Sequence, residues 1–80
     1  MPVSIVYLGP LADRAAGAPT SLPAPLDWAG LLSAVGEPLA AQLANDRVHV
    51  ACAGKVMADK RQLCAQDGEE VALLPPVSGG

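Results

Sequence analysis

The chain has 80 residues, which is enough for one small domain with a modest core and excludes two separately folded units. Eight acidic side chains against five basic ones give a net charge of −3, which argues against binding to nucleic acid or to anionic membrane surfaces and favours a protein partner with a basic face. The only aromatic residues are Tyr7 and Trp28, so we expect an aliphatic core rather than an aromatic-lined ligand pocket.

The N-terminal part of the chain contains signals for a strand, a short helix and an edge strand. VSIVYL (3–8) is rich in β-branched residues, which predicts a central strand buried on both faces. This run is too short to cross a membrane, follows no positively charged segment and has no cleavage site, so we expect a cytoplasmic protein. Pro10 and Gly17 flank a predicted short helix from Leu11 to Ala16, and Thr20 to Leu22, with prolines on both sides, predicts an edge strand.

The main helix is predicted in the middle of the chain. Asp27 stands at the N-cap position of WAGLLSAV (28–35), whose apolar residues recur at helical spacing and would pack on a sheet. Gly36 interrupts this pattern, and EPLAAQLAND (37–46) predicts one or two further helical turns. The apolar face of the main helix consists of Trp28, Leu31, Leu32 and Val35.

The C-terminal half predicts several strands. RVHVACAG (47–54) alternates, with Val48, Val50 and Cys52 on one face, which predicts a half-exposed strand. Gly54-Lys55 is expected to form the next turn. The remaining expected elements are a short strand at Val56 and Met57, a polar connection from Ala58 to Gln66, a turn at Asp67-Gly68, and a last strand containing Val71, Leu73 and Leu74.

This order of elements predicts the fold class. Strands that alternate with a few helices indicate an α+β fold in which helices cover one face of a mixed sheet. The last predicted strand runs directly into the C-terminus. We therefore expect a folded domain at residues 1–74 and an extended C-terminal tail at residues 75–80.

The sequence offers few of the groups that an active site needs. His49 is predicted on the exposed face of a strand, without a partner that the sequence identifies. There is no phosphate-binding glycine loop with its lysine, no paired-carboxylate motif and no metal-ligand spacing, so no metal site is predicted. Met57 is interpreted as part of the core. The acidic residues Asp67, Glu69 and Glu70 are interpreted as a solvated surface.

Two cysteines, Cys52 and Cys64, are too few for a disulfide scaffold or a four-ligand zinc site. Cys52 alternates with Val48 and Val50 in the predicted strand. We therefore predict buried structural thiols, with a redox or disulfide role as the alternative.

The last six residues, PPVSGG (75–80), form an unusual ending. Pro75 and Pro76 favour extended backbone and lack amide donors, so they end the sheet and keep the chain stiff. Gly79 and Gly80 have no side chains, and six extended residues reach about 20 Å, so the final carboxylate can enter a narrow channel in another protein. Adenylation by ATP would turn one carboxylate oxygen into a leaving group, and a sulfur donor could then replace AMP. A tail without chemistry is the alternative interpretation.

Three stretches of the sequence together resemble a known family. DGEEVALLPPVSGG (67–80) combines an Asp-Gly turn, an acidic pair, an apolar strand, two prolines, a small hydrophobic residue, a hydroxyl residue and a terminal Gly-Gly. This stretch closely resembles the end of the small subunit of molybdopterin synthase, the MoaD-type sulfur carrier of the ThiS/MoaD ubiquitin-like family. LADRAAG (11–17) is similar to the family's Leu-Arg-Glu-Ala-Ala-Gly segment, and RVHVACAGK (47–55) resembles its Val-Arg-Val-Ala-Val-Asn-Gly strand and turn. The likeness spans almost the whole chain.

The resemblance implies a ubiquitin-like β-grasp fold and a role in molybdenum cofactor biosynthesis. In this family a ubiquitin-activating-like, MoeB-type enzyme adenylates the terminal glycine, which is converted to a thiocarboxylate. The tail then enters the large, MoaE-type subunit of the synthase, where the sulfur passes to cyclic pyranopterin monophosphate. Such a small subunit is not an enzyme by itself and binds no cofactor, because the nucleotide belongs to the activating partner.

The resemblance also assigns roles by position. Gly80 would carry the glycyl-adenylate and then 1-thioglycine, and Gly79 would provide clearance. Pro75, Pro76, Val77 and Ser78 would line the partner's channel, and Leu73 and Leu74 would meet the partner's surface. The chain departs from the family at Ala53, where Asn is frequent, at Leu73 and Leu74, where aromatic residues are common, and in the longer connection from Ala58 to Gln66.

Two other functions stay open. One has the same fold but delivers sulfur to another pathway, namely thiamine synthesis, tRNA thiolation or cysteine synthesis, or it acts as a ubiquitin-like modifier that is joined to lysines of other proteins. Pro75-Pro76 favours the molybdopterin carrier, because carriers of the thiamine pathway more often end in a Val-Gly-Gly-Gly tail. The other is an interaction module whose tail has no chemistry.

Overall fold

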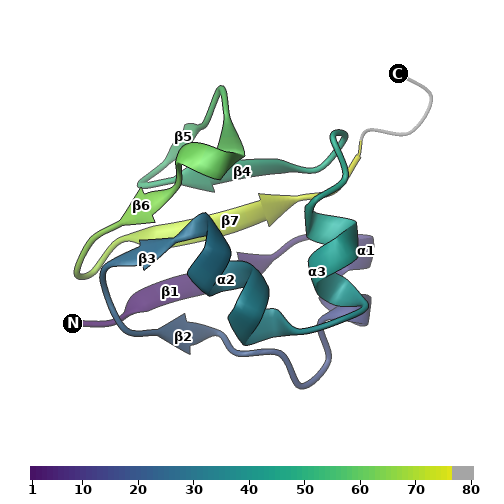
Figure 1. The fold of residues 1–80 in the computed structure, drawn as a ribbon, viewed down its shortest axis with the longest axis horizontal. Coiled ribbons are helices and arrows are strands. Elements are labelled where there is room, and N and C mark those ends of the chain that lie inside the picture. Colours follow the sequence, from purple (N-terminus) through teal and green to yellow (C-terminus); the bar gives the residue numbers. More distant parts are fainter. Residues whose placement is uncertain (77–80) are drawn as a thin grey trace.

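A mixed five-stranded sheet forms the centre of the protein in a computed structural model, which describes residues 1–76. The strand order is β2-β1-β7-β4-β5, and β1 runs parallel to β7 while the other neighbours are antiparallel (Figure 1). A two-stranded antiparallel sheet, β3-β6, lies beside it. The α+β class and the mixed sheet are thus confirmed. The elements are β1 (Val3–Tyr7), α1 (Pro10–Arg14), β2 (Ser21–Leu22), β3 (Leu26–Asp27), α2 (Trp28–Val35), α3 (Leu39–Leu43), β4 (His49–Cys52), β5 (Lys55–Val56), η1 (Lys60–Gln62), β6 (Cys64–Ala65) and β7 (Glu70–Leu74).

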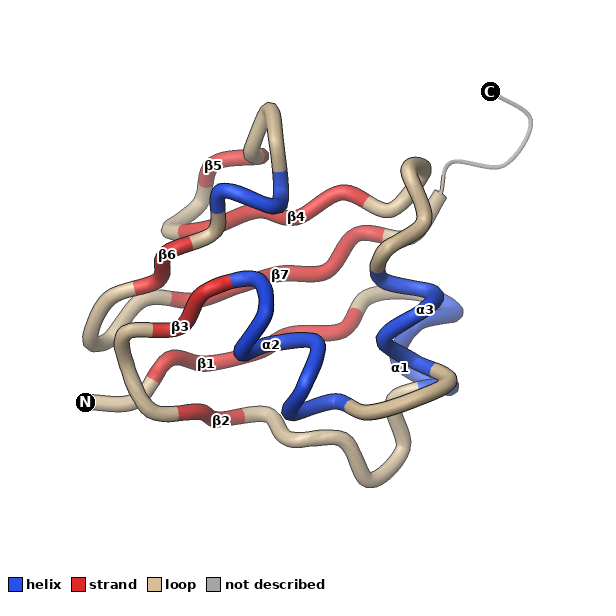
Figure 2. Tube along the Cα trace, viewed as in Figure 1, coloured by secondary structure: helices blue, strands red, loops and turns tan. Residues whose placement is uncertain are grey.

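The first predicted strand is confirmed as β1, which lies between β2 and β7. Val3 and Ile5 are buried, whereas Ser4 between them is exposed. The prediction that this strand is buried on both faces is therefore wrong. The physical reason is that α2, α3 and the small sheet lie on one side of the large sheet (Figure 2), so alternate side chains of β1 face solvent.

The short helix and the edge strand that follow are also confirmed. α1 begins at Pro10, whose fixed φ suits the first helical turn, and it ends at Arg14, slightly earlier than predicted. Gly17, with φ of +85°, adopts the left-handed conformation past the helix end. Leu11 is the buried residue of this helix. β2 lies at the edge of the large sheet, where flanking prolines cost no ladder hydrogen bonds.

The main helix forms where the sequence predicts it. Asp27 caps α2, because its Oδ1 accepts a hydrogen bond of 2.7 Å from the amide of Gly30. Leu31 is fully buried on the helix face that covers the sheet. Gly36, with φ of +71°, ends the helix, and α3 follows at Leu39–Leu43 as predicted. In the part of the chain that the structure describes, no helix is long and apolar enough to cross a membrane.

The C-terminal half contains the predicted strands with one shift in a turn. β4 buries Val50 and leaves His49 exposed, which confirms the alternation. Cys52 pairs with Lys55, so the two-residue turn consists of Ala53 and Gly54 rather than Gly54 and Lys55.

The segment from Ala58 to Gln66 is not the polar connection that the sequence suggested. It contains η1 and β6, and β6 pairs with β3 through Leu26 and Ala65. Leu63 and Ala65 are buried, at 2% and 0% exposure. The expectation is wrong because two apolar side chains in a polar stretch are enough to bind it to the core.

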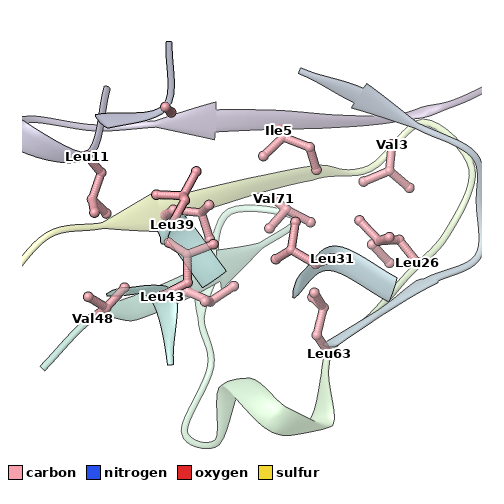
Figure 3. Close-up of a cluster of buried hydrophobic side chains, with 14 residues drawn as sticks. Val3, Ile5, Leu11, Leu26, Leu31, Leu39, Leu43, Val48, Leu63 and Val71 are labelled. Carbon is pink, nitrogen blue, oxygen red and sulfur yellow. The ribbon is translucent and has the colours of Figure 1, made fainter. Parts of the chain in front are cut away.

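The core is aliphatic, as predicted, and lies between the large sheet and the elements that cover it (Figure 3). Tyr7 and Trp28 are only partly buried and pack against its margin, as does Met57. Burial of a Leu or Val side chain contributes about 1.5–3 kcal/mol relative to exposure, so this cluster is the main source of stability. Its members are Val3, Ile5, Leu11, Ala15, Leu26, Leu31, Leu39, Leu43, Val48, Val50, Leu63, Ala65, Val71 and Leu73.

Candidate functional site

The predicted tail begins directly after the last strand, β7. It lies in the middle of the large sheet, parallel to β1 and antiparallel to β4. Beyond the paired residues, the amide of Leu8 donates a 3.2 Å hydrogen bond to the carbonyl of Leu73. Leu74 pairs with His49 on the other side. The end of β7 is therefore held from both sides.

Two prolines follow directly at the end of this strand. β7 ends at Leu74, and Pro75 and Pro76 continue the chain without amide donors. Pro75 is half-buried, whereas Pro76 is exposed. Both were predicted tail residues. The others, Val77, Ser78, Gly79 and Gly80, lie outside the described residues, so their roles stay predictions.

A groove of about 440 Å³ lies beside the two prolines at the exit of the tail. Its apolar walls come from α1, from Val48 just before β4 and from the two prolines, and the exposed polar residues Arg14 and Asn45 also line it. This groove could not be predicted from local sequence patterns, because its walls come from four separate segments. The lining residues are Pro10, Leu11, Arg14, Gln42, Asn45, Val48, Pro75 and Pro76.

The two leucines expected on a partner surface differ in exposure. Leu73 has 0% exposure and belongs to the core, so its side chain cannot meet a partner. The expectation that Leu73 meets a partner is wrong, because side chains alternate along a strand and Leu73 points to the covered face of the sheet. Leu74 points to the opposite face, is partly exposed and lies beside the exposed His49.

The opposite face of the sheet carries an apolar row across four strands. Val6 of β1 pairs with Ala72 of β7, Ala72 pairs with Ala51 of β4, and Ala51 pairs with Val56 of β5. Residues paired in this way share one face of a sheet. Val56 is 62% exposed, and the other three are partly exposed. This row, which we call the outer apolar row, extends the surface near Leu74.

The acidic residues lie at the other end of β7. Glu70 begins the strand, and Asp67 and Glu70 are exposed, as predicted for a solvated surface. Glu69 differs, because it is partly buried and its Oε1 accepts a 2.7 Å hydrogen bond from the amide of Gln66. Glu69 therefore stabilises the turn before β7, and the whole strand separates it from the tail.

The two cysteines are free and have different surroundings. Cys52 is partly buried against the core, and burial together with the nearby Glu69 carboxylate, 3.9 Å from its Sγ, raises the pKa of its thiol. Cys64 is exposed and accepts a 3.1 Å hydrogen bond from Nε2 of Gln66. The prediction of buried structural thiols fits Cys52 in part and is wrong for Cys64, because β6 turns that side chain away from the core.

A second groove, of about 560 Å³, lies between β4 and η1, and Lys60 is one of its lining residues. The Lys60 ammonium donates hydrogen bonds to the carbonyls of Leu43 at 2.8 Å and Val48 at 2.9 Å, and also to that of Asn45. It also lies 5.6 Å from the centre of the Trp28 ring. Burial lowers the pKa of Lys60. Since its donors are committed to the backbone, Lys60 acts as a structural link and not as a free amine.

Within residues 1–76, no three His, Cys, Asp or Glu side chains are grouped to hold a metal ion. His49 is exposed, as predicted. The features gathered at one end of the molecule are the end of β7, the two prolines, the groove and Leu74.

Comparison of the sequence with protein-family models and with curated proteins finds no match.

Proposed function

We propose that this protein is a sulfur carrier that uses the carboxylate of Gly80, as the small subunit of a molybdopterin synthase does. One observation carries the proposal: β7 is held between two strands and continues without a break into Pro75-Pro76 and the sequence Val-Ser-Gly-Gly. The proposal requires Gly80 to be the C-terminal residue of the active form.

The fold supports this proposal. A sheet with order β2-β1-β7-β4-β5, in which the first and last strands are central and parallel and a helix crosses one face, is consistent with a ubiquitin-like β-grasp. In such an arrangement the last strand cannot shift without breaking two ladders. The starting point of the tail is therefore fixed relative to the surface that a partner recognises.

The chemistry takes place at one carbon atom. A carboxylate oxygen of Gly80 attacks the α-phosphorus of ATP and displaces pyrophosphate, which gives a glycyl-adenylate. A sulfur donor at the oxidation level of hydrosulfide then attacks the acyl carbon, the bond to the AMP oxygen breaks, and AMP leaves. The product is 1-thioglycine at Gly80. A MoeB-type enzyme supplies the nucleotide site for these steps.

The delivery of sulfur needs reach and a narrow profile. Six extended residues span about 20 Å, and the last two lack side chains, so the thiocarboxylate fits a deep channel of a MoaE-type large subunit. There the sulfur passes to cyclic pyranopterin monophosphate. The domain supplies a docking surface, for which we propose Leu74 and the outer apolar row, and the partner supplies the catalysis.

Mass spectrometry tests the proposal directly. The protein is incubated with a MoeB-type enzyme, ATP and sulfide, and we expect the C-terminal peptide to gain the mass difference between sulfur and oxygen. The matched variants are a deletion of Gly80 and an extension by one alanine, both of which should stay folded and unmodified. A native wild-type chain that stays unmodified, while the enzyme thiolates its own carrier in a parallel reaction, would refute the proposal.

A second assay separates the possible destinations. The thiolated protein is mixed with a MoaE-type subunit and cyclic pyranopterin monophosphate, and we expect conversion to molybdopterin. Transfer to a thiazole precursor or to tRNA, or conjugates on lysines, in place of that conversion would keep the carboxylate chemistry and change the pathway.

A further inference from the structure

Gly9, at the turn between β1 and α1, is in direct contact with the start of the tail. Its backbone has φ of +57° and ψ of −137°, a combination that is almost restricted to glycine. The preceding residue, Leu8, is bound to Leu73 of β7, so this turn lies beside the end of the last strand. The local conformation alone would explain a glycine here, but its surroundings add a second reason.

The ring of Pro75 occupies the space where a side chain at Gly9 would stand. A Cβ at Gly9 would lie 3.0 Å from Cγ of Pro75, 3.9 Å from its Cβ and 4.0 Å from its Cδ. The proline ring is closed onto its own backbone, so it cannot turn away as a flexible side chain does. Relief of such a contact would therefore require a change in the pucker of this ring or a displacement of Pro75, the first residue of the tail.

Pro75 lies against this turn at one wall of the groove beside the tail. Pro75 and Pro76 line the groove together with Pro10 and Leu11, which follow Gly9 in the chain. Pro75 is half-buried, while Pro76, one residue further, is exposed. The contact with Gly9 is thus located where the chain passes from the sheet into the tail.

We propose that Gly9 is a positioning residue for the tail: the absence of its side chain provides the seat for Pro75, and this contact sets the direction in which the tail leaves the sheet. The inference rests on the proposed function. It adds a residue that lies far from Gly80 in sequence and takes no part in the chemistry.

The length of the tail makes its starting direction important. If a partner holds the six residues extended, a tilt of roughly 20° at Pro75 moves the end of an arm of about 20 Å by roughly 7 Å. Reacting atoms must approach to about 3–3.5 Å, so a wrongly directed tail must be bent back during binding. The free energy needed to bend the tail back therefore weakens binding to the partner. It raises KM and leaves kcat unchanged.

An NMR experiment tests the seat without any enzyme. We expect nuclear Overhauser effects between the Hα protons of Gly9 and the ring protons of Pro75 in the native protein. Gly9→Ala should remove these contacts and shift the resonances of Pro75 and Pro76. The matched control is Gly17→Ala, which also places alanine at a positive φ but has no atom within 4 Å of the new Cβ, and it should leave the proline resonances unchanged.

A kinetic experiment tests the consequence for the tail. The probe is the release of pyrophosphate by a MoeB-type enzyme with ATP, at varied concentrations of folded carrier. Gly9→Ala is expected to raise KM about tenfold, which corresponds to about 1.4 kcal/mol of binding energy used to bring the redirected tail back, while Gly17→Ala changes KM less than twofold. A loss of stability alone would lower the folded fraction and would not change KM per folded molecule.

Double variants identify the contact responsible. In a Pro75→Ala background the ring is absent, so Gly9→Ala should raise KM less than twofold, whereas in a Pro76→Ala background the full effect should remain. Equal effects of Gly9→Ala in all three backgrounds, or unchanged Pro75 resonances in Gly9→Ala, would overturn the inference. If the wild-type chain is not adenylated by an enzyme that is active on its own carrier, the proposed function fails, and the NMR result still decides whether Gly9 seats Pro75.

Discussion

The ammonium group of Lys60 lies 5.6 Å from the centre of the Trp28 ring, so a residue of η1 is joined to the first turn of α2. The same group donates hydrogen bonds to the carbonyls of Leu43 and Val48, at the end of α3 and the approach to β4. One side chain thus connects η1, α2, the end of α3 and the approach to β4.

Replacing Lys60 by Met should destabilise the protein by about 2–3 kcal/mol, because charge-assisted hydrogen bonds are lost and partly buried carbonyls are left without this donor. Urea unfolding measures this loss. Lys55→Met is the matched control, since Lys55 is exposed at the β4–β5 turn and its loss should change stability by less than about 0.5 kcal/mol. Equal effects of the two substitutions would contradict the structural role of Lys60.

Neighbouring leucines at the end of β7 should respond in opposite ways. Leu73→Ala should cost about 2–5 kcal/mol, because it leaves a cavity in the core, while Leu74→Ala should cost less than about 1.5 kcal/mol. Thermal and urea unfolding of both variants measure the difference. On the proposed docking surface, Leu74→Asp should weaken binding to the large subunit while the protein stays folded, which isothermal titration calorimetry can measure. Undiminished binding of Leu74→Asp would remove Leu74 from that surface.

Ala53 is a residue whose replacement should stabilise the fold. It has φ of +53° in the turn between β4 and β5, a conformation that costs an alanine about 1 kcal/mol and that asparagine tolerates. Ala53→Asn should therefore raise the free energy of unfolding by about 0.5–1 kcal/mol. Gly54→Ala, at φ of +84°, is the opposite control and should destabilise by a similar amount. A lower melting temperature for Ala53→Asn would count against this turn geometry.

Tyr7 should make stability fall at alkaline pH. Its hydroxyl donates a 2.7 Å hydrogen bond to the carbonyl of Pro19, and burial raises its pKa above 10.0. Since the folded state keeps the proton longer than the unfolded state, the stabilisation is complete below pH 10 and is lost as pH rises through the folded pKa. As the single tyrosine, Tyr7 can be titrated by its absorbance at alkaline pH.

The matched variant for this pH effect is Tyr7→Phe, which lacks the titrating group. It should lose about 0.5–1.5 kcal/mol at neutral pH through the missing hydrogen bond, and its stability should depend less on pH above 10. A wild-type tyrosine that titrates below its ordinary pKa would contradict the burial of this side chain.

The two thiols should react at different rates. Cys64 is exposed, whereas Cys52 is partly covered. The pKa of the Cys52 thiol is raised, so less of it is ionised to the reactive thiolate than in an ordinary cysteine. A chromogenic disulfide reagent should therefore give two phases, and peptide mapping should assign the fast phase to Cys64. Cys64→Ser should remove only the fast phase. A single phase for the wild type would show that Cys52 is as accessible as Cys64.

Local patterns were sufficient for much of the fold. The β-branched run of β1, the Asp27 cap of α2 and the alternation in β4 act within a few residues, and the structure confirms each of them. The end of the sheet at Leu74 also follows from a local property, because prolines cannot continue a ladder. The burial of Leu73 was likewise visible in its alternation with Leu74, although the family resemblance suggested a surface role.

Features that depend on distant residues were missed. The strands β3 and β6 have two residues each, too few for any periodicity, and they exist only because Leu26 and Ala65 meet on the core. The role of Lys60 depends on carbonyls of two other elements. Gly9 was visible as a glycine before Pro10, but its contact with Pro75 depends on the parallel pairing of β1 and β7. Tertiary structure, and not propensity, creates these contacts.

The position of β7 between β1 and β4 has a mechanical consequence. A partner that grips the tail pulls along the axis of β7, while the hydrogen bonds on both sides of that strand lie across it. Such a force loads the two ladders in shear, and their bonds must break together rather than one at a time. On the proposed function, this resistance would keep the domain intact each time the tail is drawn into a channel and withdrawn.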